Sequence, residues 1–115
     1  MVYGSTDAIH SNLRMYKDGK LKYSSGELLP IDENGDFYAG DVRATENMGL
    51  TTLQILFLRE HNRLCDLIKA ANSTFSDQEI FNTARNYVVG LIQKVSFEDY
   101  LPNLFGRTHF KKYIG

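Results

Sequence analysis

Residues 50–68, LTTLQILFLREHNRLCDLI, hold the longest helical pattern in the chain. Apolar residues recur there at steps of three and four, the spacing of one face of an α-helix: Leu50, Leu53, Phe57, Leu64, Leu67 and Ile68. The polar face carries Arg59, Glu60, Asn62, Arg63 and Asp66. The pattern predicts a helix of roughly 20 to 25 residues that ends at Asn72-Ser73-Thr74. Apolar residues at 55–58 extend around this helix, which is typical of burial inside a larger core.

A second helix is predicted after a short loop. Residues 76–79, SDQE, match a capping box, in which the Ser76 hydroxyl accepts from the Glu79 amide and the Glu79 carboxylate reaches back. The helix behind this box has one apolar stripe, made of Ile80, Ala84, Tyr87 or Val88, Leu91 and Val95. Two long helices joined by a short loop are expected to lie antiparallel.

The rest of the chain is predicted to be shorter or irregular. Residues 97–104 indicate a short third helical segment, broken by Pro102 and stopped by Gly106. Residues 1–42 are rich in turn-forming residues and lack a sustained period. We therefore expect a mainly α fold, with an irregular loop and turn region in 1–42 and a helical core segment in 43–115.

Two local structures are predicted within the irregular region. Asp18-Gly19 lies between short apolar stretches and indicates a tight turn, as in a small hairpin. Residues 5–13 are compatible with a short helix whose N-cap is Ser5 or Thr6.

Composition bounds the class of protein. The 115 residues suffice for one modest core, and 43% hydrophobic with 23% charged residues is near the globular average. A formal charge of −1 gives no sign of a nucleic-acid partner, and no apolar run approaches the length of a membrane span. No signal peptide is recognisable at the N-terminus, so the compartment stays open. Asn72 begins a glycosylation sequon, which matters only if the protein is secreted.

Arg43 and Glu46 lie three positions apart in GDVRATENMG, residues 40–49, just before the long helix. One interpretation is a surface ion pair at a helix start, worth about 0.3–0.5 kcal/mol. The other is a cofactor site, in which one residue polarises a substrate and the other holds a prosthetic group. The spacing alone leaves both open.

A family resemblance favours the cofactor site. The run from Phe37 contains GD-x-R-x-x-E, then LREHNR, and later the segment EDYLP, residues 98–102. In this order these motifs closely resemble the animal-type haem peroxidases, a superfamily that includes cyclooxygenases and related fatty-acid oxygenases. The resemblance covers nearly all of residues 1–115, which are expected to form part of a haem peroxidase domain. It implies a helical fold around haem b, with hydrogen peroxide and a small electron donor as reactants.

The resemblance also implies roles for individual residues. Arg43 matches the family's distal arginine, whose guanidinium donates to peroxide oxygens, and Glu46 matches the glutamate that forms an ester with a haem methyl. Asn47 replaces the methionine that makes a second haem link in some members, and Gln54 stands where many relatives have histidine. The family's distal histidine, calcium loop and proximal histidine fall outside the matched segment. The remainder of the domain is therefore an expected partner, and no metal ligand is assigned here.

Other chemically notable residues are predicted to be structural. His61, in LREHNR, is expected to be a hydrogen-bonded helix-packing residue, and neither His10 nor His109 is expected to act as a catalytic base. Cys65 is expected to be a small buried hydrophobic residue. The following aromatic residues are expected to lie in the core: Phe57, Tyr87, Phe97 and Tyr100.

The preferred interpretation is a peroxidase domain segment that supplies Arg43 and Glu46 to the haem. Two alternatives stay open: a non-catalytic helical fragment or interaction module, and a fatty-acid dioxygenase of the same superfamily. The isolated 115 residues are expected neither to bind haem stoichiometrically nor to turn over peroxide. By resemblance to the family, an extracellular or secreted location is expected.

Overall fold

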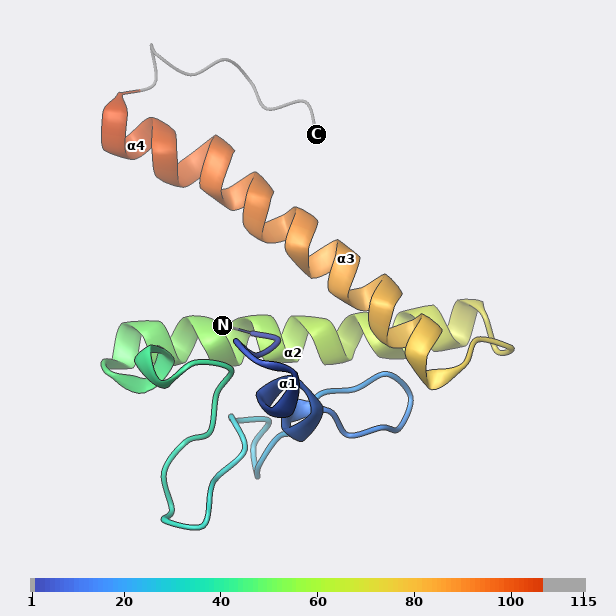
Figure 1. Cartoon of the computed structure of the whole chain (residues 1–115). Helices are drawn as coiled ribbons and strands as arrows, with labels where there is room; N and C mark the ends of the chain where they lie inside the picture. The colour runs from blue at the N-terminus through green and yellow to red at the C-terminus, as the bar shows by residue number, and fades with distance from the viewer. Residues whose placement is uncertain (1, 107–115) are drawn as a thin grey trace. The chain divides into compact units, whose positions relative to one another are not determined.

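The computed structural model describes residues 2–106, which are mainly helical (Figure 1). The described helices are α1 (Asp7–Leu13), the 3₁₀ turn η1 (Val42–Thr45), α2 (Met48–Ala71), α3 (Asp77–Val95), the π-helical turn η2 (Ser96–Tyr100) and α4 (Leu101–Phe105). The chain divides into two compact units, Met1–Ala84 and Arg85–Gly115. Within the described part, no helix is long and apolar enough to cross a membrane. The predicted mainly α fold class is confirmed.

Helix α2 confirms the long helix predicted from the sequence. It has 24 residues, and the side chain of Asn47 caps it by accepting from the Leu50 amide at 3.0 Å. The buried side differs from the predicted apolar stripe and comprises Gln54, Leu58, His61, Cys65 and Ile68. Leu53 and Leu67 instead lie half-exposed. The apolar period located the helix correctly, but it did not identify the side that packs.

The irregular region of the first unit is organised by α1 and by a tight turn. Thr6 caps α1 through its hydroxyl, which accepts from the Ile9 amide, so the short helix is confirmed. The turn at Asp18-Gly19 is confirmed as well, because Arg14 and Leu21 form an antiparallel bridge around it. Gly19 has φ +72°, and a Cβ there would lie 2.6 Å from the backbone nitrogen of Phe81. Only glycine fits this approach without displacing α3.

The core of the first unit joins this irregular region to the helices. One cluster holds five buried side chains, Leu13, Leu21, Leu29, Leu58 and Phe81. A second lies where the first two turns of α3 pack on the end of α2, and it contains Cys65, Ile68, Ile80 and Ala84. The start of α3 is fixed by the predicted capping box, since Glu79 Oε2 accepts from the Ser76 amide at 2.8 Å and Ser76 Oγ accepts in return.

In the second unit, the prediction that Pro102 breaks the helix is wrong, because the helix continues through it. The amide of Leu101 donates to the carbonyl of Ser96, so the chain widens into the π-helical turn η2 and then continues as α4. The Pro102 ring enters at the first turn of α4, where a missing N–H does least harm. Gly106, with φ +91°, ends the helix as predicted.

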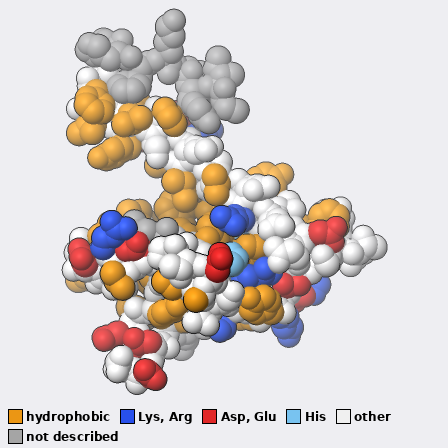
Figure 2. All heavy atoms as spheres, viewed as in Figure 1, with side chains coloured by type: hydrophobic (Ala, Val, Ile, Leu, Met, Phe, Trp, Pro, Cys, Tyr) orange, Lys and Arg blue, Asp and Glu red, His pale blue; other side chains and the backbone are white. Residues whose placement is uncertain are grey.

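Many large apolar side chains stand on the surface of the described chain (Figure 2). The core positions predicted for Tyr87, Phe97 and Tyr100 are wrong here, because these side chains are 63%, 44% and 61% exposed. Phe57 is partly buried. Helical spacing of the aromatic residues therefore indicated a face that the described residues, 2–106, leave uncovered.

Candidate functional site

The segment that carries Arg43 and Glu46 is a single 3₁₀ turn directly before α2. Asp41 is its N-cap, with an extended backbone and a carboxylate that accepts from the Arg43 amide at 3.0 Å. At the other end of the turn, the Glu46 amide donates to the Arg43 carbonyl. Residues three apart eclipse one another in a 3₁₀ helix, so this turn brings Arg43 and Glu46 onto the same face.

Arg43 is paired with Asp41 rather than with Glu46. Its Nε lies 2.8 Å from one oxygen of the Asp41 carboxylate, and its Nη2 lies 2.8 Å from the other. These hydrogen bonds from Arg43 hold the pKa of Asp41 well below its ordinary value and raise the pKa of the guanidinium. The surface ion pair between Arg43 and Glu46, one of the two interpretations of the sequence, is absent from this turn.

The turn has an inward and an outward side. Ala44 is fully buried, whereas the side chain of Arg43 is 70% exposed and Glu46 is exposed. Val42 and Met48 flank them, and each is 86% exposed. Two large apolar groups thus stand in water beside a guanidinium and a carboxylate, a mixture suited to an amphipathic ligand or to a covering protein surface.

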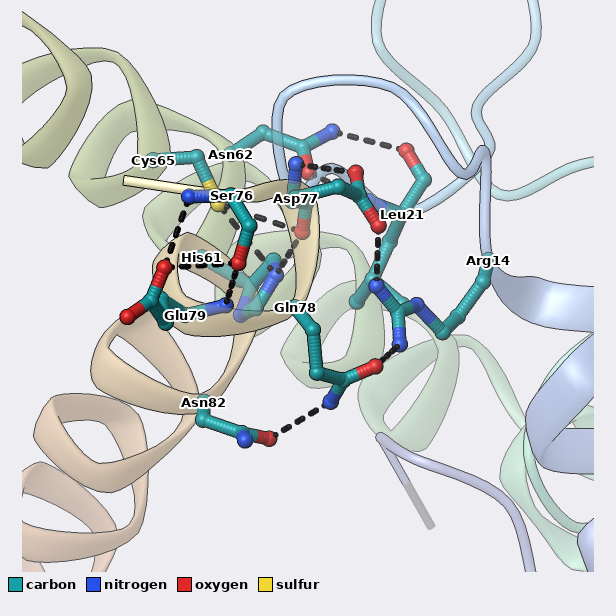
Figure 3. A network of polar contacts seen from close by, with 11 residues as sticks. Arg14, Leu21, His61, Asn62, Cys65, Ser76, Asp77, Gln78, Glu79 and Asn82 are labelled. Carbon is teal, nitrogen blue, oxygen red and sulfur yellow. Dashed lines mark hydrogen bonds and ion pairs between the residues drawn. The ribbon is translucent and has the colours of Figure 1, made fainter. Parts of the chain in front are cut away.

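His61 is the centre of a separate, buried network (Figure 3). Its Nε2 lies 2.9 Å from the Gly19 carbonyl, which only accepts, so Nε2 carries the proton. Its Nδ1 must then accept from the hydroxyl of Tyr3, at 2.9 Å. The thiol of Cys65 donates to the same Gly19 carbonyl at 3.3 Å. Both residues have the structural roles predicted from the sequence.

Burial sets the protonation of this network. Removal from water lowers the pKa of His61 from its ordinary value of 6.5, and a hydrogen bond to Gly19 only partly opposes this. Burial also raises the pKa of the Cys65 thiol to about 12, so this thiol is not a nucleophile at neutral pH.

The folded chain is expected to lose stability as the pH falls below about 6.5. Because His61 has a lower pKa folded than unfolded, the unfolded chain binds the proton first. The contribution of neutral His61 is thus fully present above pH 6.5 and declines until the pH passes the folded pKa. Urea denaturation at several pH values should show this decline, and His61→Gln should reduce it. His10→Gln, on α1, is the control; an equal effect there would contradict the assignment.

A second buried network, built around Arg14, was not predicted from the sequence (Figure 3). The Arg14 guanidinium, 3% exposed, donates to Asp77 Oδ2 and to Gln78 Oε1, each at 2.5 Å, and lies 4.0 Å above the ring of Phe81. Asp77 Oδ1 also accepts from the Gly19 amide at 2.7 Å. A lone arginine at the end of a short helix carries no pattern that predicts this burial. An acidic residue in the first turn of α3 was the one available hint.

The polar residues of LREHNR also hold the irregular region against α2. The amide side chain of Asn62 bonds both the N–H and the carbonyl of Leu21, at 2.9 and 3.1 Å. Arg59 donates to the carbonyls of Gly26 and Glu27. This motif therefore fixes the fold of the first unit and lies apart in role from the turn that bears Arg43.

The comparisons with known proteins agree with this architecture. The model of the animal haem peroxidase family matches residues 1–114. The chain belongs to the animal haem peroxidase family. The family resemblance inferred from the GD-x-R-x-x-E, LREHNR and EDYLP motifs is thereby confirmed.

Both peroxidases and fatty acid alpha-dioxygenases are among the relatives of this animal haem peroxidase segment. Alpha-dioxygenase PIOX of Nicotiana tabacum is 40% identical over 103 residues, or 90% of this chain and 16% of the tobacco protein. Peroxidase mlt-7 of Caenorhabditis elegans is 35% identical over 130 residues, or 100% of this chain and 17% of that protein. The chain therefore spans about a sixth of the length of these curated relatives.

A solved structure confirms the fold at this level. Peroxidase A from Dictyostelium discoideum matches with a TM-score of 0.81 and 27% identity, covering 98% of this chain and 25% of that one. The helices described above are thus those of an animal haem peroxidase domain.

The residues of the exposed turn have the chemistry to lie against one side of a haem. The exposed turn offers apolar contacts from Val42 and Met48 beside a carboxylate and a guanidinium. Both ring nitrogens of His61 are occupied inside the core, and Nδ1 of His10 bonds the Tyr3 carbonyl. His109 lies outside the described residues. Within residues 2–106, no group of His, Cys, Asp and Glu is arranged to hold a metal ion.

Proposed function

We propose that this segment forms the distal wall of a haem-dependent peroxidase, which uses hydrogen peroxide to oxidise a small donor. The observation that carries the proposal is the exposed 3₁₀ turn, on which Arg43 and Glu46 share one face between two exposed apolar side chains. A flat, largely apolar group that bears a reactive centre would meet both residues at once. Haem, when bound, supplies the redox chemistry by which electrons pass from donor to peroxide.

Arg43 would act as an electrostatic stabiliser. Its guanidinium uses two N–H groups on Asp41 and keeps its other donors for a ligand. Placed beside peroxide, these donors stabilise the negative charge that develops on the leaving oxygen as the O–O bond breaks. Because an arginine stays protonated at every physiological pH, Arg43 orients and stabilises the peroxide but does not take its proton.

Glu46 would anchor the haem covalently. Glu46 would hold the haem through an ester between its carboxyl group and a haem methyl, an oxidative linkage for which hydrogen peroxide would supply the two-electron oxidant and be reduced to water. Asn47 offers no second link, because its side-chain oxygen caps α2. A carboxylate that is exposed in this chain is free to make such a bond when the haem covers it.

Glu46→Gln tests this proposal in the complete protein that contains the chain. After incubation with peroxide, the unaltered protein should retain its haem when extracted with acidified organic solvent, whereas the variant should release nearly all of it. Glu60→Gln is the control, because Glu60 is tied to Arg63 on α2 and should leave retention unchanged. Equal retention by Glu46→Gln and the unaltered protein would overturn the role of Glu46.

A second candidate function is fatty-acid dioxygenation, which the 40% identity to the tobacco alpha-dioxygenase favours. Glu46 argues for a peroxidase over the cyclooxygenase branch, which lacks the ester-forming carboxylate, but it leaves open a fatty-acid oxygenase that retains the glutamate. The two activities differ in their oxidant. Oxygen uptake that depends on a fatty acid, without peroxide-driven oxidation of a small donor, would favour the dioxygenase. A complete protein that takes up no haem would favour the non-catalytic helical module.

A further inference from the structure

We propose that Asp41 is a positioning residue for the peroxidase reaction, which holds the Arg43 guanidinium in the orientation that meets peroxide. The inference rests on the proposed function of Arg43. It adds a third residue of the GD-x-R-x-x-E motif to the site, beside Arg43 and Glu46, and gives it a role that acts through Arg43.

The geometry of the pair is that of a fixed fork. Each Asp41 oxygen accepts one N–H of the guanidinium, from Nε and from Nη2, both at 2.8 Å. Two parallel hydrogen bonds define the plane of the guanidinium as well as its position. The remaining donors, both on Nη1 and one on Nη2, then point away from Asp41 in a fixed direction.

Asp41 is itself held more firmly than a surface partner would be. One of its oxygens also accepts from the Arg43 backbone amide at 3.0 Å, which ties the carboxylate to the start of the 3₁₀ turn. Its side chain is only 12% exposed, whereas that of Arg43 is 70% exposed. A mostly buried carboxylate that is anchored to the backbone thus restrains a long and exposed side chain.

The pair also suits a site that closes over Arg43. When a haem and the surrounding protein exclude water, an unpaired guanidinium would lose its hydration without compensation, whereas a paired one keeps two charge-assisted hydrogen bonds. The hydrogen bonds from Arg43 lower the pKa of Asp41, so the carboxylate is ionised at neutral pH.

A double-mutant cycle in the complete protein tests the inference. Asp41→Ser keeps an N-cap hydroxyl but removes the fork, and it should lower kcat/KM for peroxide by roughly 10–100-fold through misplacement of Arg43. In an Arg43→Ala background the same substitution should have almost no further effect. Asp41→Asn keeps one acceptor for the amide and should show an intermediate loss. Asp36→Ser, at an exposed loop position, is the control.

A second readout is independent of activity. In the 115-residue chain, the ¹⁵N–¹H signal of Arg43 Nε should be protected from exchange, and Asp41→Ser should abolish this protection while the circular dichroism of the helices is unchanged. Arg63 Nε, paired with Glu60 at 2.8 Å, is the internal reference.

The outcomes separate the two proposals. If Arg43→Ala leaves the peroxidase rate unchanged, the proposed function fails whatever Asp41 does. If Arg43→Ala lowers the rate but Asp41→Ser does not, Asp41 is only a helix cap and the inference is overturned. An equal loss from Asp41→Ser with and without Arg43 would overturn it too, because Asp41 would then act by another route.

Discussion

Replacement of Arg43 by alanine is expected to lower kcat for peroxide-dependent oxidation by roughly 10²–10³-fold, the effect of losing one donor aimed at a developing negative charge. The haem content should be unchanged, because the proposed anchor is Glu46 and not Arg43. The structure makes this separation testable, since the two side chains share one turn and the Arg43 side chain is bonded to Asp41 rather than to Glu46. Steady-state kinetics with a chromogenic donor, at a haem concentration measured by absorbance, gives the number directly.

Arg63 provides a matched control for this loss. It forms the same kind of two-bond pair, with Nε and Nη2 each 2.8 Å from an oxygen of Glu60, and its side chain is 58% exposed. Arg63→Ala should therefore leave the rate within about twofold, as for most exposed ion pairs. Arg43→Lys should recover little activity, because an ammonium keeps the charge but lacks the fork. A rate within about threefold of the unaltered protein for Arg43→Ala would exclude a role in the reaction.

Local sequence signals predicted the helices and their ends. Each cap, such as Thr6 or Ser76, depends on residues within four positions, and the structure contains them as predicted. The spacing of Arg43 and Glu46 was likewise enough to place them on one face. The partner of Arg43 was not predictable in the same way. Its guanidinium bonds Asp41, the N-cap of the turn, and not Glu46.

The sequence predictions that were wrong mainly concern contacts between residues far apart in the chain. Apolar spacing could not tell which side of α2 packs, since that depends on which segment lies against it, and here Gln54 and His61 are buried while Leu53 is half-exposed. Arg14 and Asp77 are 63 positions apart, so no window of sequence joins them. Pro102 does not break the helix, because the π-helical turn before it lets the helix continue.

Asp77→Ala is expected to lower the free energy of unfolding by about 3 kcal/mol, the low end of the cost of breaking a buried ion pair, because the guanidinium is buried but the Asp77 carboxylate is 30% exposed. Arg14 is 3% exposed and its Nε already has no partner, so loss of the Asp77 carboxylate would leave the guanidinium with Gln78 and the ring of Phe81. Such a loss is a large share of the stability of a small domain. Urea denaturation followed by circular dichroism measures it.

A comparison with Asp66→Ala tests whether burial of Arg14 causes the stability loss expected for Asp77→Ala. Asp66→Ala breaks an ion pair with Lys20 in which the carboxylate is 63% exposed, and it should cost about 0–1 kcal/mol. If Asp77→Ala and Asp66→Ala lower the free energy of unfolding by the same amount, burial of Arg14 adds nothing to the strength of its ion pair. Adding Arg14→Met to Asp77→Ala should recover part of the loss, because the uncompensated charge is then removed.

Asp77→Ala should also have an effect at a distance that a simple loss of helix capping would not produce. Asp77 accepts from the Gly19 amide, and the Gly19 carbonyl in turn accepts from His61 and Cys65. If the Asp77 carboxylate holds the Gly19 turn in place, then removing the carboxylate lets the turn move. The Gly19 carbonyl would then no longer stay bonded to His61 and Cys65, and water could reach the Cys65 thiol. The thiol, fully buried in the intact fold, should then react with a thiol reagent faster at urea concentrations well below the unfolding transition. Ser76→Ala, which removes only the cap hydroxyl, should leave that rate nearly unchanged.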